Sequence, residues 1–211
     1  MPKILGVKVD QITLTQAVKR VETWLKTPKK RFIVTPNPEM VMLAQKDEEF
    51  RKFLNQADLS ICDGSGLRLK DKRLQIIKGT DLMLELIKHG HKTLLVGGAP
   101  GVAQKAAEKL GVVGISEPDI KAINRIKPDL LFVALGQVKQ EKWIVKNLPK
   151  LKVKVAMGVG GALDQIVRPW LRAPKFLQIL GLEWLYRLIL QPWRLKRQLA
   201  LLKFLGKLLT T

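Results

Sequence analysis

Short runs of consecutive apolar residues alternate along this chain with segments in which apolar residues recur every three or four positions. The clearest runs cover residues 31–35, 59–63, 93–97, 130–136 and 154–158. Such runs are typical of strands buried on both faces, and the segments between them have the period of amphipathic helices. The alternation predicts an α/β fold, Rossmann-like in the loose sense, with a mainly parallel sheet and helices on both faces.

The helices of this fold are predicted from the same periodicity. They cover residues 13–27, 38–56 with a break near 46–47, 81–89, 102–110, 119–126 and 139–148. A further strand or hairpin arm is expected over residues 4–10. Residues 1–166 are therefore assigned to one α/β core, which is a normal size for a domain.

Residues 167–211 differ in composition from this core. They hold three of the five tryptophans and many basic and aliphatic residues, against a single acidic residue, Glu183. This mixture is typical of amphipathic helices on an anionic lipid surface, and it predicts a helical C-terminal appendage. The alternative is a helical hairpin that caps the core or a neighbouring subunit.

The formal net charge of +20 points to an anionic partner. Nucleic acid, a phosphate-bearing substrate and the inner face of a membrane all fit, and a lysine-rich solubilising surface is the plain alternative. No nucleic-acid-binding motif is present, and the aromatic residues cluster with aliphatic ones in the tail. We therefore expect no nucleic-acid partner.

Cysteine and histidine are too scarce to predict a disulfide framework or a metal site. Cys62 is the one cysteine, and the two histidines, His89 and His91, do not make a zinc site by themselves. The N-terminal apolar stretch is too short for a signal peptide, and no uncharged run reaches the length of a membrane span. We expect a cytoplasmic protein.

Glycine and small polar residues follow five of the predicted strands, where ligands bind in open parallel sheets. Thr35 and Asn37 lie at the end of the first of these strands. Gly97 and Gly98 open a helix whose amides could hold a phosphate, although such turns also occur for packing. Asp63 ends another strand and is a candidate general base, with a simple Asp-Gly turn as the alternative. Asp164 has the same ambiguity, and Gln140 lies at a helix start.

Three arginines of the tail are candidates for binding a diphosphate. Arg194 and Arg197 share a helix face, and Pro192 provides a bend that lets Arg187 converge with them. Guanidinium groups match phosphate oxygens bidentately. Contact with lipid headgroups is the alternative.

In chain order, these segments resemble the WecG/TagA/CpsF family of bacterial glycosyltransferases. The most specific stretch is Gly181-Leu182-Glu183-Trp184-Leu185-Tyr186-Arg187, followed by Pro192 and Arg194. The other carrying segments are residues 35–41, 57–66, 79–82, 95–98, 128–141, 158–161 and 172–174. The resemblance spans nearly the whole chain.

The resemblance implies an inverting, metal-independent hexosyltransferase that needs no cofactor. It would move N-acetylmannosamine, or a related sugar, from a UDP-sugar to N-acetylglucosamine on undecaprenyl diphosphate, in cell-wall or surface-polysaccharide synthesis. Asp63 would be the base. The sugar would be surrounded by Thr35, Asn37 and Gln140, and the donor diphosphate would be held by Arg187, Arg194 and Arg197 from a mobile appendage. A homo-oligomer, peripheral on the inner face of the cell membrane, is also implied.

The sequence departs from the family pattern in three places. Gln75 and Ile76 stand where the family has Glu-Arg, in a shortened loop; residues 111–119 are also shorter, and Val138 replaces a usual proline. These departures leave as an alternative a catalytically weakened family member that acts as a membrane-associated scaffold. The charge leaves a second alternative, a basic nucleic-acid-binding protein.

Overall fold

The protein is described by a computed structural model that covers residues 2–179, 182–192 and 195–209. The side chains of residues 178, 179, 183, 187, 195–198 and 209 lie outside the described part.

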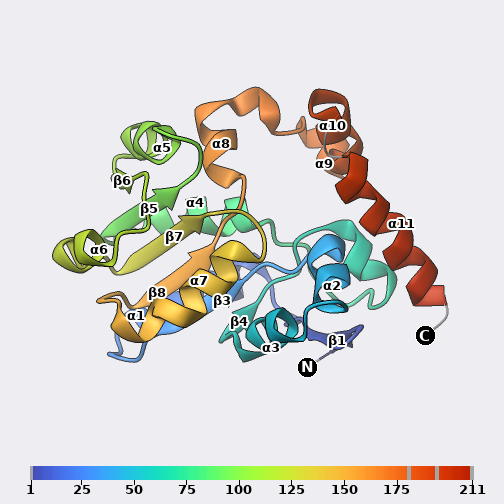
Figure 1. Ribbon diagram of the computed structural model, residues 1–211, viewed down its shortest axis with the longest axis horizontal. Coiled ribbons are helices and arrows are strands. Elements are labelled where there is room, and N and C mark those ends of the chain that lie inside the picture. Colours follow the sequence, from blue (N-terminus) through green and yellow to red (C-terminus); the bar gives the residue numbers. More distant parts are fainter. Residues whose placement is uncertain (1, 180–181, 193–194, 210–211) are drawn as a thin grey trace.

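A six-stranded parallel sheet forms the centre of the molecule, in the order β4-β3-β8-β7-β5-β6 (Figure 1). Its strands are β3 (Arg31–Val34), β4 (Leu59–Ser60), β5 (Thr93–Gly97), β6 (Val113–Ile115), β7 (Leu130–Ala134) and β8 (Val155–Gly158). A small antiparallel hairpin of β1 (Lys3–Ile4) and β2 (Val7–Lys8) lies outside it. The predicted parallel α/β sheet is confirmed.

Helices cover both faces of the sheet, because alternate strand residues point to opposite sides. On one face, Phe132 of β7 and Met157 of β8 pack with residues of α1, α4, α5 and α8. On the other, Val133 and Ala156 pack with residues of α2, α3, α6 and α7. The bounds are α1 (Leu14–Leu25), α2 (Pro38–Ala44), α3 (Glu48–Gln56), α4 (Gly79–Lys88), α5 (Val102–Leu110), α6 (Ile120–Ile126), α7 (Lys139–Asn147) and α8 (Ala162–Val167).

The break predicted near residues 46–47 is present between α2 and α3. Asp47 is the N-cap of α3, and its side chain accepts a hydrogen bond from the backbone N–H of Phe50 at 2.9 Å. A capped start of this kind satisfies a backbone donor that the helix itself leaves unpaired. Two elements, β6 and α8, were not expected from the sequence.

The tail is helical, as predicted, and forms α9 (Lys175–Ile179), α10 (Glu183–Leu190) and α11 (Leu195–Leu209). Helix α11 folds back along α2, where Figure 1 shows the two side by side. Phe204 of α11 is fully buried there, and Lys207 donates a hydrogen bond to the side chain of Gln45 at 3.2 Å. Within the described residues, no helix combines the length and apolar character needed to cross a membrane.

Candidate active site

A polar cavity of about 290 Å³ lies beyond the carboxyl ends of the central strands. Four of the predicted site residues line it together: Thr35, Asn37, Asp63 and Gln140. They come from the segments after β3 and β4 and from the first turn of α7, so the parallel topology brings together residues far apart in the sequence. Further lining residues are Gly136, Gln137, Gly160, Asp164, Arg168 and Gln191.

Asp63 is held beside the segment that follows β3. Strand β4 pairs with β3 in parallel, and this pairing continues past both strand ends, where the backbone N–H of Asp63 donates to the carbonyl of Pro36 at 2.9 Å. The register therefore places the carboxylate of residue 63 next to Thr35 and Asn37 on the cavity wall.

Thr35 and Asn37 are both fixed by neighbouring helices. The side-chain oxygen of Asn37 caps α2 by accepting from the N–H of Met40 at 3.0 Å, so its amide nitrogen is the group that can contact a ligand. Thr35 is buried against the start of α4. A Cβ on Gly79 would lie only 3.1 Å from the methyl carbon of Thr35, which explains the glycine at that position.

Gln140 is the centre of a buried hydrogen-bond network. It is 2% exposed; its oxygen accepts from the backbone N–H of Gly160 at 2.9 Å, and its nitrogen donates to Glu141 at 2.7 Å. The other oxygen of Glu141 accepts from the N–H of Val138 at 2.7 Å. Burial raises the pKa of the Glu141 carboxyl above its ordinary value, although these hydrogen bonds oppose the shift.

Val138 has a backbone φ of +70° and a ψ of −52°. A β-branched residue rarely adopts this region, and the strain persists because Glu141 holds the N–H of the same residue. Proline, whose ring fixes φ near −65°, could not take this conformation. Val138, which stands where the family usually has proline, is therefore consistent with the local backbone.

The charges on the cavity wall are mixed. Among the described lining residues, Asp63 and Asp164 are carboxylates and Arg168 is a guanidinium group. Helix α4 begins at Gly79 on the same wall, and the partial positive charge of a helix amino end favours an anion. The site can thus contact both hydroxyl and phosphate groups.

Gln137 contributes a hydrogen-bond acceptor to this site. Its side-chain oxygen is buried and has no partner among the described residues. A buried polar atom left unpaired costs free energy, so a ligand N–H or O–H that reached this oxygen would gain from pairing with it.

The remaining predicted site residues are not brought to this cavity by the described structure. Gly97 and Gly98 do not line it; a Cβ on Gly97 would lie 2.8 Å from the carbonyl oxygen of Ala134, so close packing against β7 accounts for that glycine. Arg194 lies outside the described residues. Arg187 and Arg197 lie in α10 and α11, and their side chains are outside the described part. These five assignments stay predictions.

Several lining residues were not singled out from the sequence: Thr80, Gln137, Gln165, Arg168 and Gln191. Gln137 lies in the segment between β7 and α7, three residues after Ala134, so the strand-end rule could have found it. Arg168 and Gln191 come from the chain after α8, whose path over the strand ends has no signal in the sequence.

Cys62, beside Asp63, is fully buried. Burial, together with the nearby Asp63 carboxylate, raises the pKa of its thiol to about 12. The thiolate is the reactive form of cysteine, so this residue is an inert part of the core and takes no part in the chemistry of the site.

The sheet and the polar cavity beyond its carboxyl ends define a Rossmann-like α/β protein with a small-molecule site. The chain belongs to the glycosyl transferase WecG/TagA/CpsF family, and the match covers residues 2–211. It is 33% identical to an N-acetylglucosaminyldiphosphoundecaprenol N-acetyl-beta-D-mannosaminyltransferase of Staphylococcus aureus strain MRSA252, across 97% of this chain and 91% of that protein. The protein of the same name from strain NCTC 8325 / PS 47 is 32% identical over the same shares.

Proposed function

We propose that this glycosyltransferase moves N-acetylmannosamine from a UDP-sugar to N-acetylglucosamine on undecaprenyl diphosphate. The names of its relatives give this transferred sugar and this acceptor. In the proposed step, Asp63 takes the proton of the acceptor C4 hydroxyl, and the oxygen attacks the anomeric carbon of the donor. The bond from that carbon to UDP breaks, UDP leaves with the electron pair, and the configuration inverts. The proton ends on the Asp63 carboxylate.

The observation that carries this proposal is the meeting of Asp63 with Thr35, Asn37 and Gln140 in one polar cavity. A carboxylate that is close to amide and hydroxyl groups, in a site able to admit a sugar, has the environment required of a base for a hydroxyl group. The amide nitrogen of Asn37 and the oxygen of Gln137 offer one donor and one acceptor for the sugar.

The leaving diphosphate needs more positive charge than Arg168 and the amino end of α4 provide. We assign that role to Arg187, Arg194 and Arg197 in the appendage of residues 167–211. Gln191, which lies between the first two in the sequence, lines the cavity. This segment of the tail therefore runs beside the site, and guanidinium groups on it can stabilise the developing charge of UDP.

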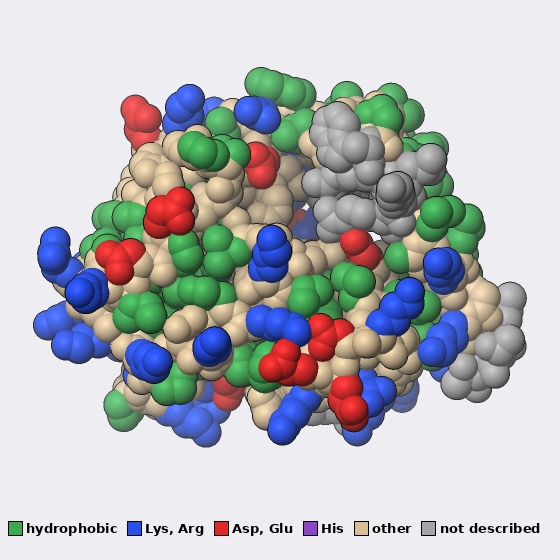
Figure 2. Space-filling view, in the orientation of Figure 1, with side chains coloured by type: hydrophobic (Ala, Val, Ile, Leu, Met, Phe, Trp, Pro, Cys, Tyr) green, Lys and Arg blue, Asp and Glu red, His purple; other side chains and the backbone are tan. Residues whose placement is uncertain are grey.

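We also propose that the tail docks the protein on the inner, anionic face of the membrane, where a lipid-linked acceptor resides. Three large apolar side chains of the tail are exposed: Trp170 (63%), Phe176 (61%) and Ile189 (69%). The same part of the chain also carries the basic residues Arg172, Lys175, Lys203 and Lys207. Figure 2 shows hydrophobic side chains along the upper edge of the molecule, where Figure 1 places the segment after α8 and helix α10. Exposed aromatic and basic residues together suit an anionic interface.

Vesicle co-sedimentation tests this docking. The protein should bind phosphatidylglycerol vesicles and not phosphatidylcholine vesicles, with weaker binding as salt rises. Trp170→Ala combined with Ile189→Ala should reduce binding at least tenfold. Val113→Ala, which removes an exposed apolar side chain at the far edge of the sheet, is the matched control. Equal binding by all variants would contradict the proposal.

Release of UDP tests the reaction itself. UDP-N-acetylmannosamine with a soluble diphosphate-linked N-acetylglucosamine analogue should give UDP, and neither substrate alone should. UDP-N-acetylglucosamine in the same assay tests the choice of sugar. Absence of UDP with every donor would favour the scaffold alternative.

The predicted homo-oligomer is tested by light scattering of the same preparation.

A further inference from the structure

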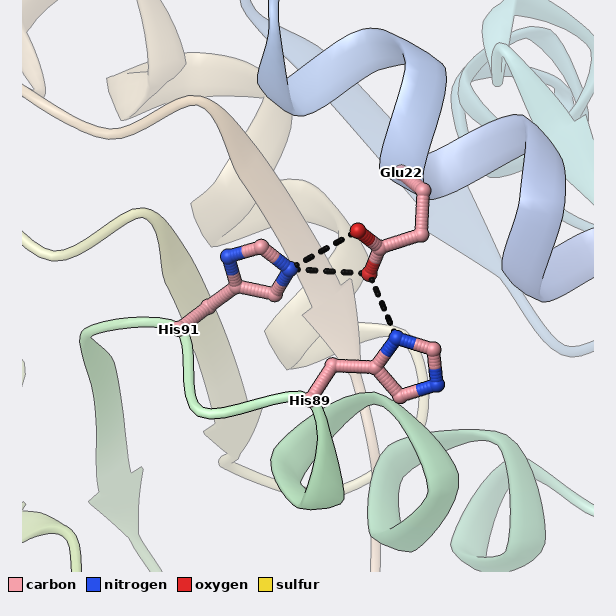
Figure 3. A group of neighbouring side chains, drawn as sticks. All are labelled: Glu22, His89 and His91. Carbon is pink, nitrogen blue, oxygen red and sulfur yellow. Dashed lines mark hydrogen bonds and ion pairs between the residues drawn. The ribbon is translucent and has the colours of Figure 1, made fainter.

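Two histidines and a glutamate converge on the side of the molecule opposite the cavity. Nε2 of His91 lies 2.8 Å and 3.0 Å from the two carboxylate oxygens of Glu22, and Nδ1 of His89 lies 3.3 Å from the first of them. Figure 3 shows both imidazole rings turned toward the carboxylate, which comes from α1. The three ligand atoms all lie within 4.8 Å of one another.

The local backbone directs the imidazole rings of His89 and His91 toward the same carboxylate. His89 is the C-cap of α4, and Gly90 follows it with a φ of +76°, a conformation that glycine adopts without strain. This turn brings the chain back so that His91 faces the same carboxylate. The carbonyl of His91 accepts a hydrogen bond from the hydroxyl of Thr93 at 2.9 Å, which fixes the entry into β5.

The spacing of these atoms suits a transition-metal ion. Zinc binds imidazole nitrogen and carboxylate oxygen at about 2.0–2.2 Å, so neighbouring ligand atoms of a tetrahedral site lie about 3.3 Å apart. The nitrogen-to-oxygen distances here are 2.8 Å and 3.3 Å. All three side chains are partly accessible, which gives an ion a path to the site.

We propose that Glu22, His89 and His91 form a binding site for a divalent transition metal ion, with zinc as the best fit to two imidazoles and one carboxylate. The ion would tie α1 to the connection between α4 and β5, with a fourth position left to water. It would stabilise the fold and take no part in sugar transfer, because the cavity lies at the other end of the strands.

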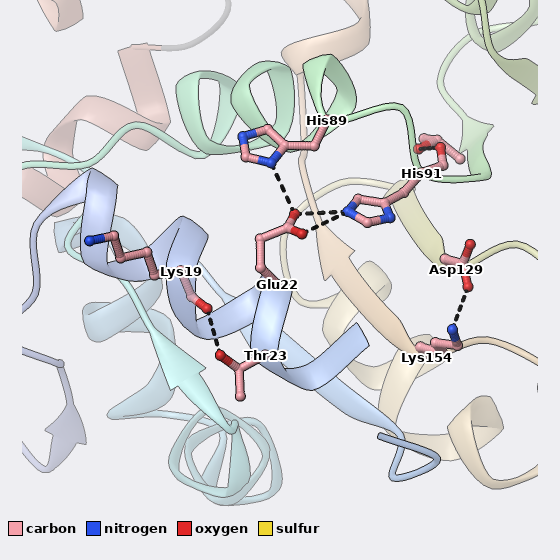
Figure 4. A network of polar contacts seen from close by, with 8 residues as sticks. Lys19, Glu22, Thr23, His89, His91, Asp129 and Lys154 are labelled. Carbon is pink, nitrogen blue, oxygen red and sulfur yellow. Dashed lines mark hydrogen bonds and ion pairs between the residues drawn. The ribbon is translucent and has the colours of Figure 1, made fainter. Parts of the chain in front are cut away.

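Charged groups near this site are paired with one another or point away from it. Glu85, one turn before His89 on α4, is paired with Lys88 at 2.7 Å. Figure 4 shows the side chain of Lys19, one turn before Glu22, directed away from the cluster. Asp129 is paired with Lys154 at 2.9 Å and is therefore engaged elsewhere. The chain has no other histidine, and the one cysteine is buried with a pKa of about 12, so it competes poorly for zinc.

Calorimetric titration of the untagged full chain with zinc chloride at pH 7.5, after treatment with a chelator, tests the proposal. One zinc ion should bind per chain and raise the melting temperature. Proton NMR of the two histidine rings gives a readout that needs no variant. Both rings should shift on zinc addition and neither should shift with magnesium, which prefers oxygen ligands.

Glu22→Gln, His89→Gln and His91→Gln should each weaken zinc binding at least tenfold. Glu48→Gln, which alters a surface ion pair at the start of α3, away from the cluster, should leave it unchanged. Sugar transfer should be unaffected by Glu22→Gln, so failure of this proposal is distinct from failure of the proposed reaction. Unshifted histidine rings, or equal zinc affinity in wild type and all three variants, would overturn the metal site.

Discussion

The side-chain oxygen of Gln140 accepts a hydrogen bond from the backbone N–H of Gly160 at 2.9 Å, and this contact joins α7 to the loop after β8. Glu141 sets the direction of that amide, because its carboxylate accepts from the Gln140 nitrogen at 2.7 Å. A buried carboxylate behind the cavity therefore orients a residue on the cavity wall.

Replacing Glu141 with glutamine should disturb this orientation. An amide offers one acceptor where the carboxylate offers two, so one of the two donors from Val138 and Gln140 would face an N–H₂ group. We expect kcat/KM for the donor to fall by about ten- to a hundredfold, the range expected for a small displacement of a site group. Steady-state UDP release measures this, with the exposed Glu117→Gln as the control. Unchanged kinetics in E141Q would show that Gln140 needs no such support.

The same residue predicts a pH dependence of stability. The pKa of Glu141 in the folded chain is raised above the model-peptide value of 4.5, so its contribution to stability is full below that value and is lost as the pH rises through the folded pKa. E141Q lacks this titration. The melting temperature of wild type minus that of E141Q should therefore decrease between pH 4.5 and pH 8. A constant or growing difference would contradict the assigned shift.

Gly158→Ala should displace Gln140 directly. A Cβ at residue 158 would lie 2.7 Å from the Gln140 nitrogen, so the side chain must move out of its hydrogen bonds. We expect a loss of activity of at least tenfold by UDP release, with the far-UV spectrum unchanged. Gly206→Ala in α11, where no atom lies within 4 Å of the added Cβ, is the control and should be neutral or stabilising by up to about 1 kcal/mol. Full activity in G158A would mean that Gln140 is dispensable.

Phe204→Ala should loosen helix α11 from the core. Truncating a fully buried phenylalanine costs about 3–5 kcal/mol, which is lost here from the packing of α11 on α2. Thermal denaturation and protease sensitivity of the C-terminal segment measure the effect. Leu202→Ala removes a side chain that is 65% exposed on the same helix and should change the free energy of unfolding by less than about 0.5 kcal/mol. Equal stability of the two variants would contradict the docking of α11.

The sequence predicted the main strands because their apolar runs are continuous, as burial on both faces requires. Strand β6 was not predicted because Val113-Gly114-Ile115 is short, half-exposed and interrupted by glycine. Helix α8 was missed because it begins at Ala162 directly after Gly160 and Gly161, and paired glycines are also typical of a loop after a strand. Neither strand order nor the packing of α11 on α2 has a local signal, since both depend on contacts between distant segments.

For the site, the strand-end rule identified Thr35, Asn37 and Asp63 because parallel strands deliver their carboxyl ends to one edge. It could not tell whether Gly97 serves close packing against β7 or contact with a ligand, because both favour glycine. The convergence of His89 and His91 on Glu22 was also beyond the sequence, because the third ligand is on a different helix.

The central claim, that Asp63 is the base for the acceptor hydroxyl, is tested most directly by Asp63→Asn with saturating donor and acceptor. General-base catalysis contributes about 10²–10⁴-fold, so kcat should fall by that factor while calorimetry still finds donor binding within about threefold of wild type. Asp119→Asn, an exposed helix cap on α6, should keep full activity. Turnover by D63N at the wild-type rate would contradict the account.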